Sequence, residues 1–435
     1  MRSKSKMTTL LGIFILLVTL AFGVQAQEVV TIEYWQYAFE PRNVAMDMLI
    51  EQFEAANPDI HVIHNGDIAY ENFRDEIAAS APAGVGPDVV TLFYGWIPAF
   101  VDAEYLIPLP QDEFPHEWIE STFSPMVAES KFLDEYWALP TAVRSLALFY
   151  NKDLFEAAGL DPEAPPTTTE EFLAMAQQLT QYDESGNTGI ENLVTMGYAP
   201  EMPGQAHHWF REVLVRQWGG MPYSPDNRQV LWNSPEGCAA FTYLTEFETV
   251  HHTGSSDNFI YENATDAFIN GDAALHIDGS FRIGTIASSN PDLNYGVAEL
   301  PAGPNGERHT FGSYWTHGIT RQAAADEAKL EASIRFLKFI TSPEAGILWV
   351  NEVGELPAQL EAAADETLLA DPILGPFAAG LEYAHATFFV DETAQRQHLL
   401  DAYDQVRLGG VDPCEALNEA AVLEQALLDE FWANH

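Results

Sequence analysis

Basic side chains are scarce in this chain of 435 residues. Only 19 Lys and Arg residues stand against 65 Asp and Glu residues, which gives a formal net charge of -46 at pH 7. Proteins bind nucleic acid mainly by displacing counterions with Lys and Arg, so this balance excludes nucleic acid as a partner. Charge repulsion of this size weakens the compact state at low ionic strength and is screened by salt. We therefore expect adaptation to a saline habitat.

Cysteine is almost absent, because only Cys238 and Cys414 are present. Both lie in helical patterns far apart in the chain. In an oxidising compartment they could form one disulfide, while unpaired buried cysteine is also common. The sequence leaves both alternatives open.

Motifs of common enzymes are also missing. The sequence has no G-x-S-x-G, no H-E-x-x-H and no G-x-x-x-x-G-K-[ST] pattern. The adjacent pairs His207-His208 and His251-His252 cannot face one metal ion from a regular helix as residues four apart can, so we expect both pairs at the surface. The sequence predicts a protein that is not an enzyme and holds no metal or cofactor.

One long apolar run is present, and it lies at the N-terminus. Three basic residues precede the apolar stretch Leu10–Val24, and a small-residue site ends at Ala26. This pattern is typical of a secretory signal peptide, and the stretch is shorter than the roughly 20 residues of a membrane-spanning helix. We expect a signal peptide at residues 1–26, cleavage after Ala26 and a periplasmic or extracellular protein. Without a cysteine near this site, we expect no lipid anchor.

Strand patterns then alternate with helical patterns. Apolar alternation predicts strands at 29–35, 60–63, 88–94, 141–150 and 273–277. Helical spacing predicts helices at 44–56, 70–79, 152–158, 170–179 and 281–287, the first ending at Asn57-Pro58. This alternation favours an α/β fold with a parallel sheet, in which ligands bind at the carboxyl ends of the strands.

Aromatic residues gather where these strands end. Two clusters follow the first and third strands, and the stretch 311–315 predicts a third aromatic loop. Flat apolar rings flanked by carboxylates and amides suit sugar rings. The candidates for stacking on a sugar are Trp35, Tyr37, Tyr94, Trp96, Trp209, Tyr314 and Trp315. For any one of them, packing in the core is an equal alternative.

Charged and polar side chains near the same strand ends complete the predicted site. Arg144, on the strand at 141–150, offers a planar donor fork for hydroxyl groups or a carboxylate; its alternative is an ion pair between lobes. Hydrogen-bond partners for sugar hydroxyls are predicted at Glu40, Asp67, Asp278, Ser280 and Arg282. Among 65 acidic residues, solvated surface is the competing interpretation for each carboxylate, and helix capping is the alternative for Ser280.

Several stretches resemble extracellular solute-binding protein family 1, the group similar to maltose-binding protein. In family order they are 86–90 (GPDVV), 139–140 (LP), 149–159 (FYNKDLFEAAG), 165–172 (PPTTTEEF), 267–274 (AFINGDAA), 278–280 (DGS), 300–304 (LPAGP) and 336–345 (FLKFITSPEA). The resemblance implies a two-lobed periplasmic-binding-protein fold with an interlobe hinge and ligand cleft. Mapped onto this chain, it places lobe one at 27–141 plus 315–365 and lobe two at 142–314 plus 366–435.

The resemblance also implies a function and partners. It predicts the substrate-binding subunit of an ABC importer, a monomer that captures a sugar or related polyhydroxylated solute. It delivers that solute to two membrane permease subunits served by a cytoplasmic ATPase. Two alternatives stay open: a secreted glycoside hydrolase, and the same fold binding a polyamine, metal complex or organic anion.

Overall fold

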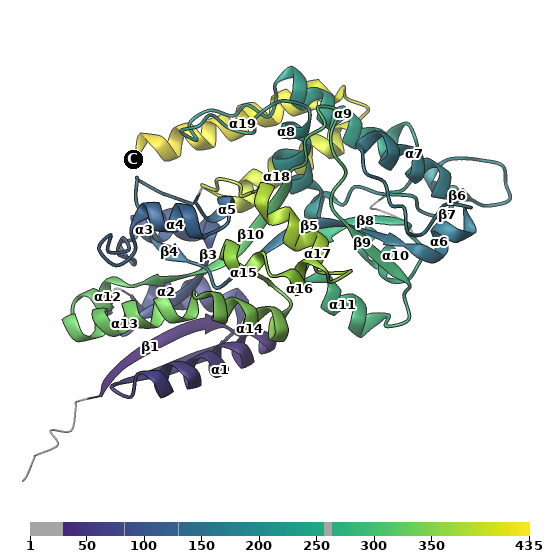
Figure 1. The fold of residues 1–435 in the computed structure, drawn as a ribbon. Helices are drawn as coiled ribbons and strands as arrows, with labels where there is room; N and C mark the ends of the chain where they lie inside the picture. The colour runs from purple at the N-terminus through teal and green to yellow at the C-terminus, as the bar shows by residue number, and fades with distance from the viewer. Residues whose placement is uncertain (1–28, 82, 129, 256–262) are drawn as a thin grey trace, which may run out of the picture.

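The computed structural model describes residues 29–435 except residues 82, 129 and 256–262. The expected signal peptide and its cleavage site lie outside the described residues. Figure 1 shows two α/β lobes joined by long strands, with α1, α13 and α14 at one end and α6, α7 and α10 at the other.

The first lobe is built on a sheet in which β1 lies between two parallel neighbours. Its strands are β1 (Val30–Tyr37), β2 (Ile60–Ile68) and β3 (Val89–Phe93). Its main helices are α1 (Glu40–Ala56), α2 (Tyr70–Ser80), α13 (Glu327–Ile340) and α14 (Pro343–Val353). Ile32 and Tyr34 alternate along β1 and are buried, and Tyr34 contacts Phe336 of α13 edge to face. The period of two in the sequence thus reflects burial of one strand face.

Two long strands connect the lobes. They are β5 (Ala142–Asn151) and β10 (Thr310–Ile319). They pair antiparallel, with Gly312 opposite Ser145 and Tyr314 opposite Val143. β10 then continues beside β3, while β5 continues between β8 (Leu275–Gly279) and β9 (Tyr295–Ala298). The short strand β11 (Leu356–Pro357) joins β5 beside this crossing.

This crossing corrects one prediction. The aromatic stretch 311–315 is part of strand β10, and it is not a loop. Its backbone pairs with β5 on one stretch and with β3 on the next. Aromatic residues fit such a paired, half-buried strand.

The second lobe surrounds the antiparallel strands β8, β5 and β9. Its main helices are α6 (Lys152–Ala157), α7 (Thr169–Leu179), α9 (Pro235–Thr249), α10 (Ala264–Ile269), α11 (Arg282–Ser289), α18 (Glu392–Arg407) and α19 (Pro413–Ala433). The parallel sheet expected from the N-terminal pattern is found as β2-β1-β3 in the first lobe, while β5 pairs antiparallel with both β8 and β9 in the second. A disulfide between Cys238 and Cys414 joins α9 to α19, so the structure selects the paired alternative.

Shorter elements fill the remaining chain. They are α3 (Ile97–Asp102), α4 (His116–Thr122), α5 (Pro125–Ala128), β4 (Ala138–Leu139), β6 (Gln181–Tyr182), β7 (Leu193–Thr195), α8 (Val215–Gln217), α12 (Arg321–Ala324), α15 (Leu360–Ala363), α16 (Glu366–Leu369), α17 (Gly375–Gly380) and β12 (Ala384–His385). None of the described helices is long and apolar enough to cross a lipid bilayer.

Candidate ligand-binding cleft

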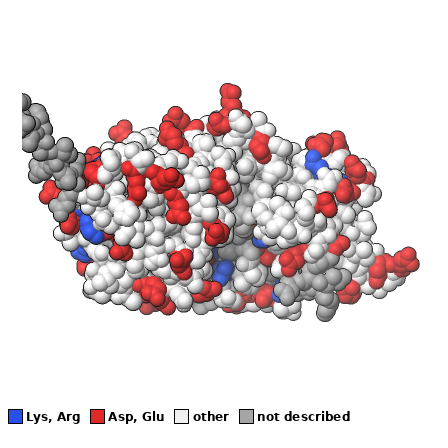
Figure 2. Space-filling model, turned by 90° about the horizontal axis from the view of Figure 1, so that it is seen from below, with Lys and Arg blue, Asp and Glu red and all other residues white. Residues whose placement is uncertain are grey.

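The surface is hollowed between the two lobes. Figure 2, seen from below, shows this hollow with a few basic side chains in it, while acidic side chains are scattered over the rest of this face. Predicted site residues lie on β1, β5, β8 and β10, and Tyr94 and Trp96 directly follow β3.

Four aromatic rings form one wall of the cleft, on the first lobe. Tyr37 ends β1, Tyr70 begins α2, Trp96 follows β3 and Trp315 lies on β10. The centroid of Trp315 lies 4.4 Å from that of Tyr37, 5.2 Å from that of Trp96 and 6.0 Å from that of Tyr70. Tyr70 is half exposed, and Trp96 and Trp315 are partly exposed, whereas Tyr37 is buried among them. The structure thus assembles three predicted aromatic residues and adds Tyr70, which the sequence analysis missed.

Other predicted aromatic residues belong to the protein interior. Trp209 is 1% exposed and packs against Phe172 and Tyr198 in the second core, so its prediction as a stacking residue was wrong. Tyr94 and Tyr314 are also buried and stack on each other at 4.5 Å. These two rings are therefore not part of the aromatic wall, although Tyr94 lines the second cavity described below.

Trp35 belongs neither to the exposed rings of the wall nor to the fully buried rings of the interior. It lies two residues before Tyr37 on β1, is partly buried, and donates its indole N–H to Glu33 at 3.2 Å. The remaining predicted acceptors of the first lobe, Glu40 and Asp67, are exposed. Glu40 lies in the first turn of α1 and Asp67 near the end of β2.

A buried carboxylate, Glu355, joins the cleft to the crossing strands. Its Oε1 accepts from Arg42 Nη2 at 2.6 Å and from Arg144 Nε at 2.7 Å, and its Oε2 accepts from the indole of Trp349 at 2.9 Å. Burial alone would raise the pKa of Glu355, but Arg144 and Arg42 outweigh it and lower that pKa to about 2. The ion-pair alternative for Arg144 is therefore realised. Arg42 and Glu355 were missed because their pairing joins segments distant in sequence.

The turn after β8 supplies the opposite wall. Asp278 is buried and accepts from Arg282 Nε at 2.6 Å and from the Gly279 N–H at 2.7 Å, and it contacts His276 at 3.2 Å. Burial would raise the pKa of Asp278, but His276 and Arg282 lower it. Asp278 was predicted to accept from a solute; instead its oxygens hold Arg282 and the turn.

Ser280 differs from its prediction as well. It is buried, makes no capping hydrogen bond to α11, and its hydroxyl has no protein partner among the described residues. Two guanidinium groups pack against the ring of the next residue, Phe281. The guanidinium carbon of Arg144 lies 5.2 Å from the ring centroid and that of Arg282 lies 5.7 Å from it. Both arginine side chains are 21% exposed.

A second cavity, of about 370 Å³, lies between loops of both lobes. Of the predicted site residues it contains Tyr94 alone, together with Lys131, Glu212, Arg216 and Thr387. Glu212 accepts from Thr387 at 2.9 Å and pairs with Arg216 at 3.1 Å. Glu212 and Arg216 thus neutralise each other, and the four rings of the first-lobe wall are not part of this cavity.

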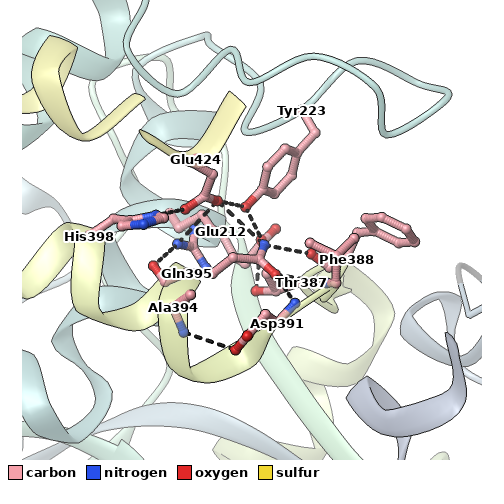
Figure 3. A network of polar contacts seen from close by, with 11 residues as sticks. Glu212, Tyr223, Thr387, Phe388, Asp391, Ala394, Gln395, His398 and Glu424 are labelled. Carbon is pink, nitrogen blue, oxygen red and sulfur yellow. Dashed lines mark hydrogen bonds and ion pairs between the residues drawn. The ribbon is translucent and has the colours of Figure 1, made fainter. Parts of the chain in front are cut away.

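A buried polar network beside that cavity fixes the start of α18 (Figure 3). Gln395 accepts from the Val390 N–H at 2.8 Å and donates to Phe388 O at 3.0 Å. Asp391 accepts from the Ala394 N–H at 3.0 Å as the N-cap. The first turn of α18 is thus held in one position relative to the cleft.

The histidine pairs correct another prediction. His207 and His208 are buried, whereas the sequence analysis placed them at the surface. His208 stacks on Phe311 with centroids 3.7 Å apart. Burial, aided by the charge of Arg211, lowers the pKa of His207 to about 3, so it stays neutral. Across the described part of the chain, no three His, Cys, Asp or Glu side chains gather to hold a metal ion.

Two α/β lobes, a hinge of paired strands and a cleft between them define a two-lobed binding protein. Structures of this class match the chain closely. The cyclic alpha-maltosyl-1,6-maltose binding protein from Arthrobacter globiformis aligns with a TM-score of 0.78 and 23% identity, over 92% of this chain and 100% of its own. The sugar-binding protein MalE from Xanthomonas citri aligns with a TM-score of 0.77 and 20% identity, over 92% and 98%.

Sequence comparison gives the family. The model of the bacterial extracellular solute-binding protein family matches residues 38–347, and this chain belongs to that family. The maltotriose-binding protein of Pyrococcus abyssi is 25% identical over 78% of this chain and 68% of its own length. The sn-glycerol-3-phosphate-binding periplasmic protein UgpB of Escherichia coli K12 is 26% identical over 78% and 76%. The family resemblance and the two-lobed fold expected from the sequence are confirmed.

Proposed function

We propose that this chain is the substrate-binding subunit of an ABC importer and captures a sugar or related polyhydroxylated solute between its lobes. The exposed rings of the aromatic wall, Tyr70, Trp96 and Trp315, carry this proposal, because several rings offered to one cleft suit the apolar faces of a sugar. The names of its relatives, which include a maltotriose-binding and a glycerol-3-phosphate-binding protein, support a polyhydroxylated cargo.

Binding without turnover fits the carboxylates better than glycoside hydrolysis does. A hydrolase needs a general acid whose pKa is raised above the ordinary range. Two buried carboxylates lie at the cleft. The pKa of Glu355 is lowered by Arg144 and Arg42, and that of Asp278 by His276 and Arg282. Each is committed to a fixed ion pair and cannot deliver a proton near neutral pH.

The lobes and the partners follow from the same proposal. Lobe one comprises 27–141 plus 315–365 and lobe two 142–314 plus 366–435, and closure about β5 and β10 buries the solute. The closed monomer, exported and cleaved after Ala26, then docks on two membrane permease subunits that work with a cytoplasmic ATPase.

A calorimetric titration of the chain from residue 27 tests the proposal. Neutral and acidic mono- and oligosaccharides are titrated in moderate salt, with polyamines and non-sugar organic acids as a second panel. We expect saturable binding of at least one sugar and unchanged sugar after overnight incubation, as followed by chromatography. Binding confined to the second panel, or release of smaller sugars, would refute it.

A further inference from the structure

The cleft collects arginine side chains although the chain as a whole has more than three acidic residues for each basic one. Arg144 and Arg282 flank Phe281 on the second wall. Arg42 packs against the rings of Tyr37 and Trp315 on the first wall, with its guanidinium carbon 5.5 and 5.4 Å from their centroids. Basic side chains also stand in the hollow in Figure 2. The local charge of the cleft thus departs from that of the surface.

Carboxylates inside the cleft are too few to neutralise these groups. Glu355 is shared by two guanidinium groups, those of Arg42 and Arg144. Asp278 is paired with Arg282. Arg42, Arg144 and Glu355 together therefore carry one net positive charge, even though both arginines contact the carboxylate.

Arg396 adds a further positive charge. It lies in the first turns of α18, is partly buried, and forms no ion pair or hydrogen bond with any residue that the structure describes. Its neighbour Gln395 and the cap Asp391 fix this part of the helix (Figure 3). A partly buried guanidinium that no carboxylate contacts is costly unless an anion approaches it.

Arg396 lies close enough to Tyr70 of the aromatic wall for its charge to act on the Tyr70 hydroxyl. Burial raises the pKa of Tyr70, the charge of Glu392 raises it further, and Arg396 and Arg144 lower it. Those three charged groups therefore lie within electrostatic range of Tyr70, which begins α2 on the first wall. Among the groups joined by these ion pairs or within range of Tyr70, four guanidinium groups stand against three carboxylates: Arg42, Arg144, Arg282 and Arg396 against Glu355, Asp278 and Glu392.

Resting on the proposed function, we infer that the cleft selects a sugar that carries an anionic group, a carboxylate or a phosphate. The ring packs on the aromatic wall formed by Trp96 and Trp315, and the anionic group is bound by Arg396 with Arg144 or Arg282. Glu40 and Asp67, which are exposed and solvated, lie outside this set. Guanidinium groups bind carboxylate and phosphate through paired hydrogen bonds.

Matched pairs of ligands test this inference. Galacturonate is compared with galactose, glucuronate with glucose, and glucose 6-phosphate with both, by calorimetry on the chain from residue 27; maltotriose serves as a neutral oligosaccharide. A charge-assisted hydrogen bond corresponds to roughly a ten- to 150-fold change in Kd. We expect one acidic sugar to bind at least tenfold more tightly than every neutral sugar. Comparing the uronates with glucose 6-phosphate then shows whether the cleft prefers a carboxylate or a phosphate.

Two variants locate the effect. Arg396→Gln is expected to lower the preference for the acidic sugar at least tenfold while the affinity for its neutral parent stays within about twofold. Arg228→Gln is the matched control: Arg228 is exposed, packs on Trp432 away from the cleft, and also has no ion-pair partner among the described residues. We expect this control to bind like the wild type.

Three results would overturn the inference. Equal or tighter binding of neutral sugars removes it and leaves the proposed function intact. Equal losses in both variants would mean that overall charge, and not the cleft, sets the preference. If no sugar of either kind binds, the proposed function and this inference both fall.

Discussion

Replacing Glu355 by Gln removes the one carboxylate that two arginines share. In the native protein, Glu355 accepts from Arg42 at 2.6 Å and Arg144 at 2.7 Å, and its pKa falls from the ordinary 4.5 to about 2. A shift of this size corresponds to roughly 3 kcal/mol of stability, at about 1.36 kcal/mol per pKa unit. Removing one partner of a buried pair leaves uncompensated charge and costs a similar amount.

The expected change in melting temperature follows from the unfolding entropy. At about 2.1 cal/mol/K per residue, a chain of this length has an unfolding entropy of roughly 0.9 kcal/mol/K. We therefore expect Glu355→Gln to melt about 3 °C below the wild type in calorimetry at pH 7. Glu352→Gln is the control, because Glu352 is exposed in neighbouring α14.

The pH dependence gives this prediction a second check. A carboxylate with a lowered pKa contributes stability that is present above its unfolded pKa of about 4.5 and is lost as the pH falls towards 2. The difference between Glu355→Gln and the wild type should therefore be largest near neutral pH and shrink below pH 4.5. A melting temperature within 1 °C of the wild type at pH 7, or a difference that grows in acid, would refute the reasoning.

Three further predictions concern the disulfide, the aromatic residues and salt. The double variant Cys238→Ser/Cys414→Ser opens a loop of 176 residues, worth up to about 5 kcal/mol of chain entropy; calorimetry should show a fall of several degrees, and no fall would contradict it. Trp315→Ala should weaken sugar binding at least tenfold, whereas Trp209→Ala should cost roughly 3 to 5 kcal/mol of stability with Kd within about twofold; titration and denaturant unfolding would expose the opposite pattern. The melting temperature should rise between low salt and molar sodium chloride, because salt screens a net charge of -46; an unchanged value would end the hypothesis of a saline habitat.

Elements with a strong local pattern were predicted well. The expected first helix ends at Ala56 as in α1, since Pro58 disfavours helical backbone just before it. The expected helix at 170–179 matches α7, whose N-cap Thr168 accepts from the Glu171 N–H. By contrast, β2 extends five residues beyond its predicted end at Ile63, because its pairing with β1 continues to Ile68.

The candidate site was predicted unevenly. Tyr37, Trp96 and Trp315 were chosen from their places beside strands, and the structure brings them into one wall. Trp209 was chosen as an aromatic residue in the same way but is buried in a core. Composition cannot separate the two cases, since the same apolar ring is favourable in a core and against a sugar.

The sequence by itself determined the family, the alternation of strands and helices and the strongly acidic composition. These properties depend on neighbours in the chain or on composition. Only the tertiary structure decided that Cys238 pairs with Cys414, that Glu355 holds both Arg42 and Arg144, and that Arg396 has no carboxylate partner among the described residues. Each of these depends on the distance between side chains from remote segments, and that distance is set by how the sheets and helices pack.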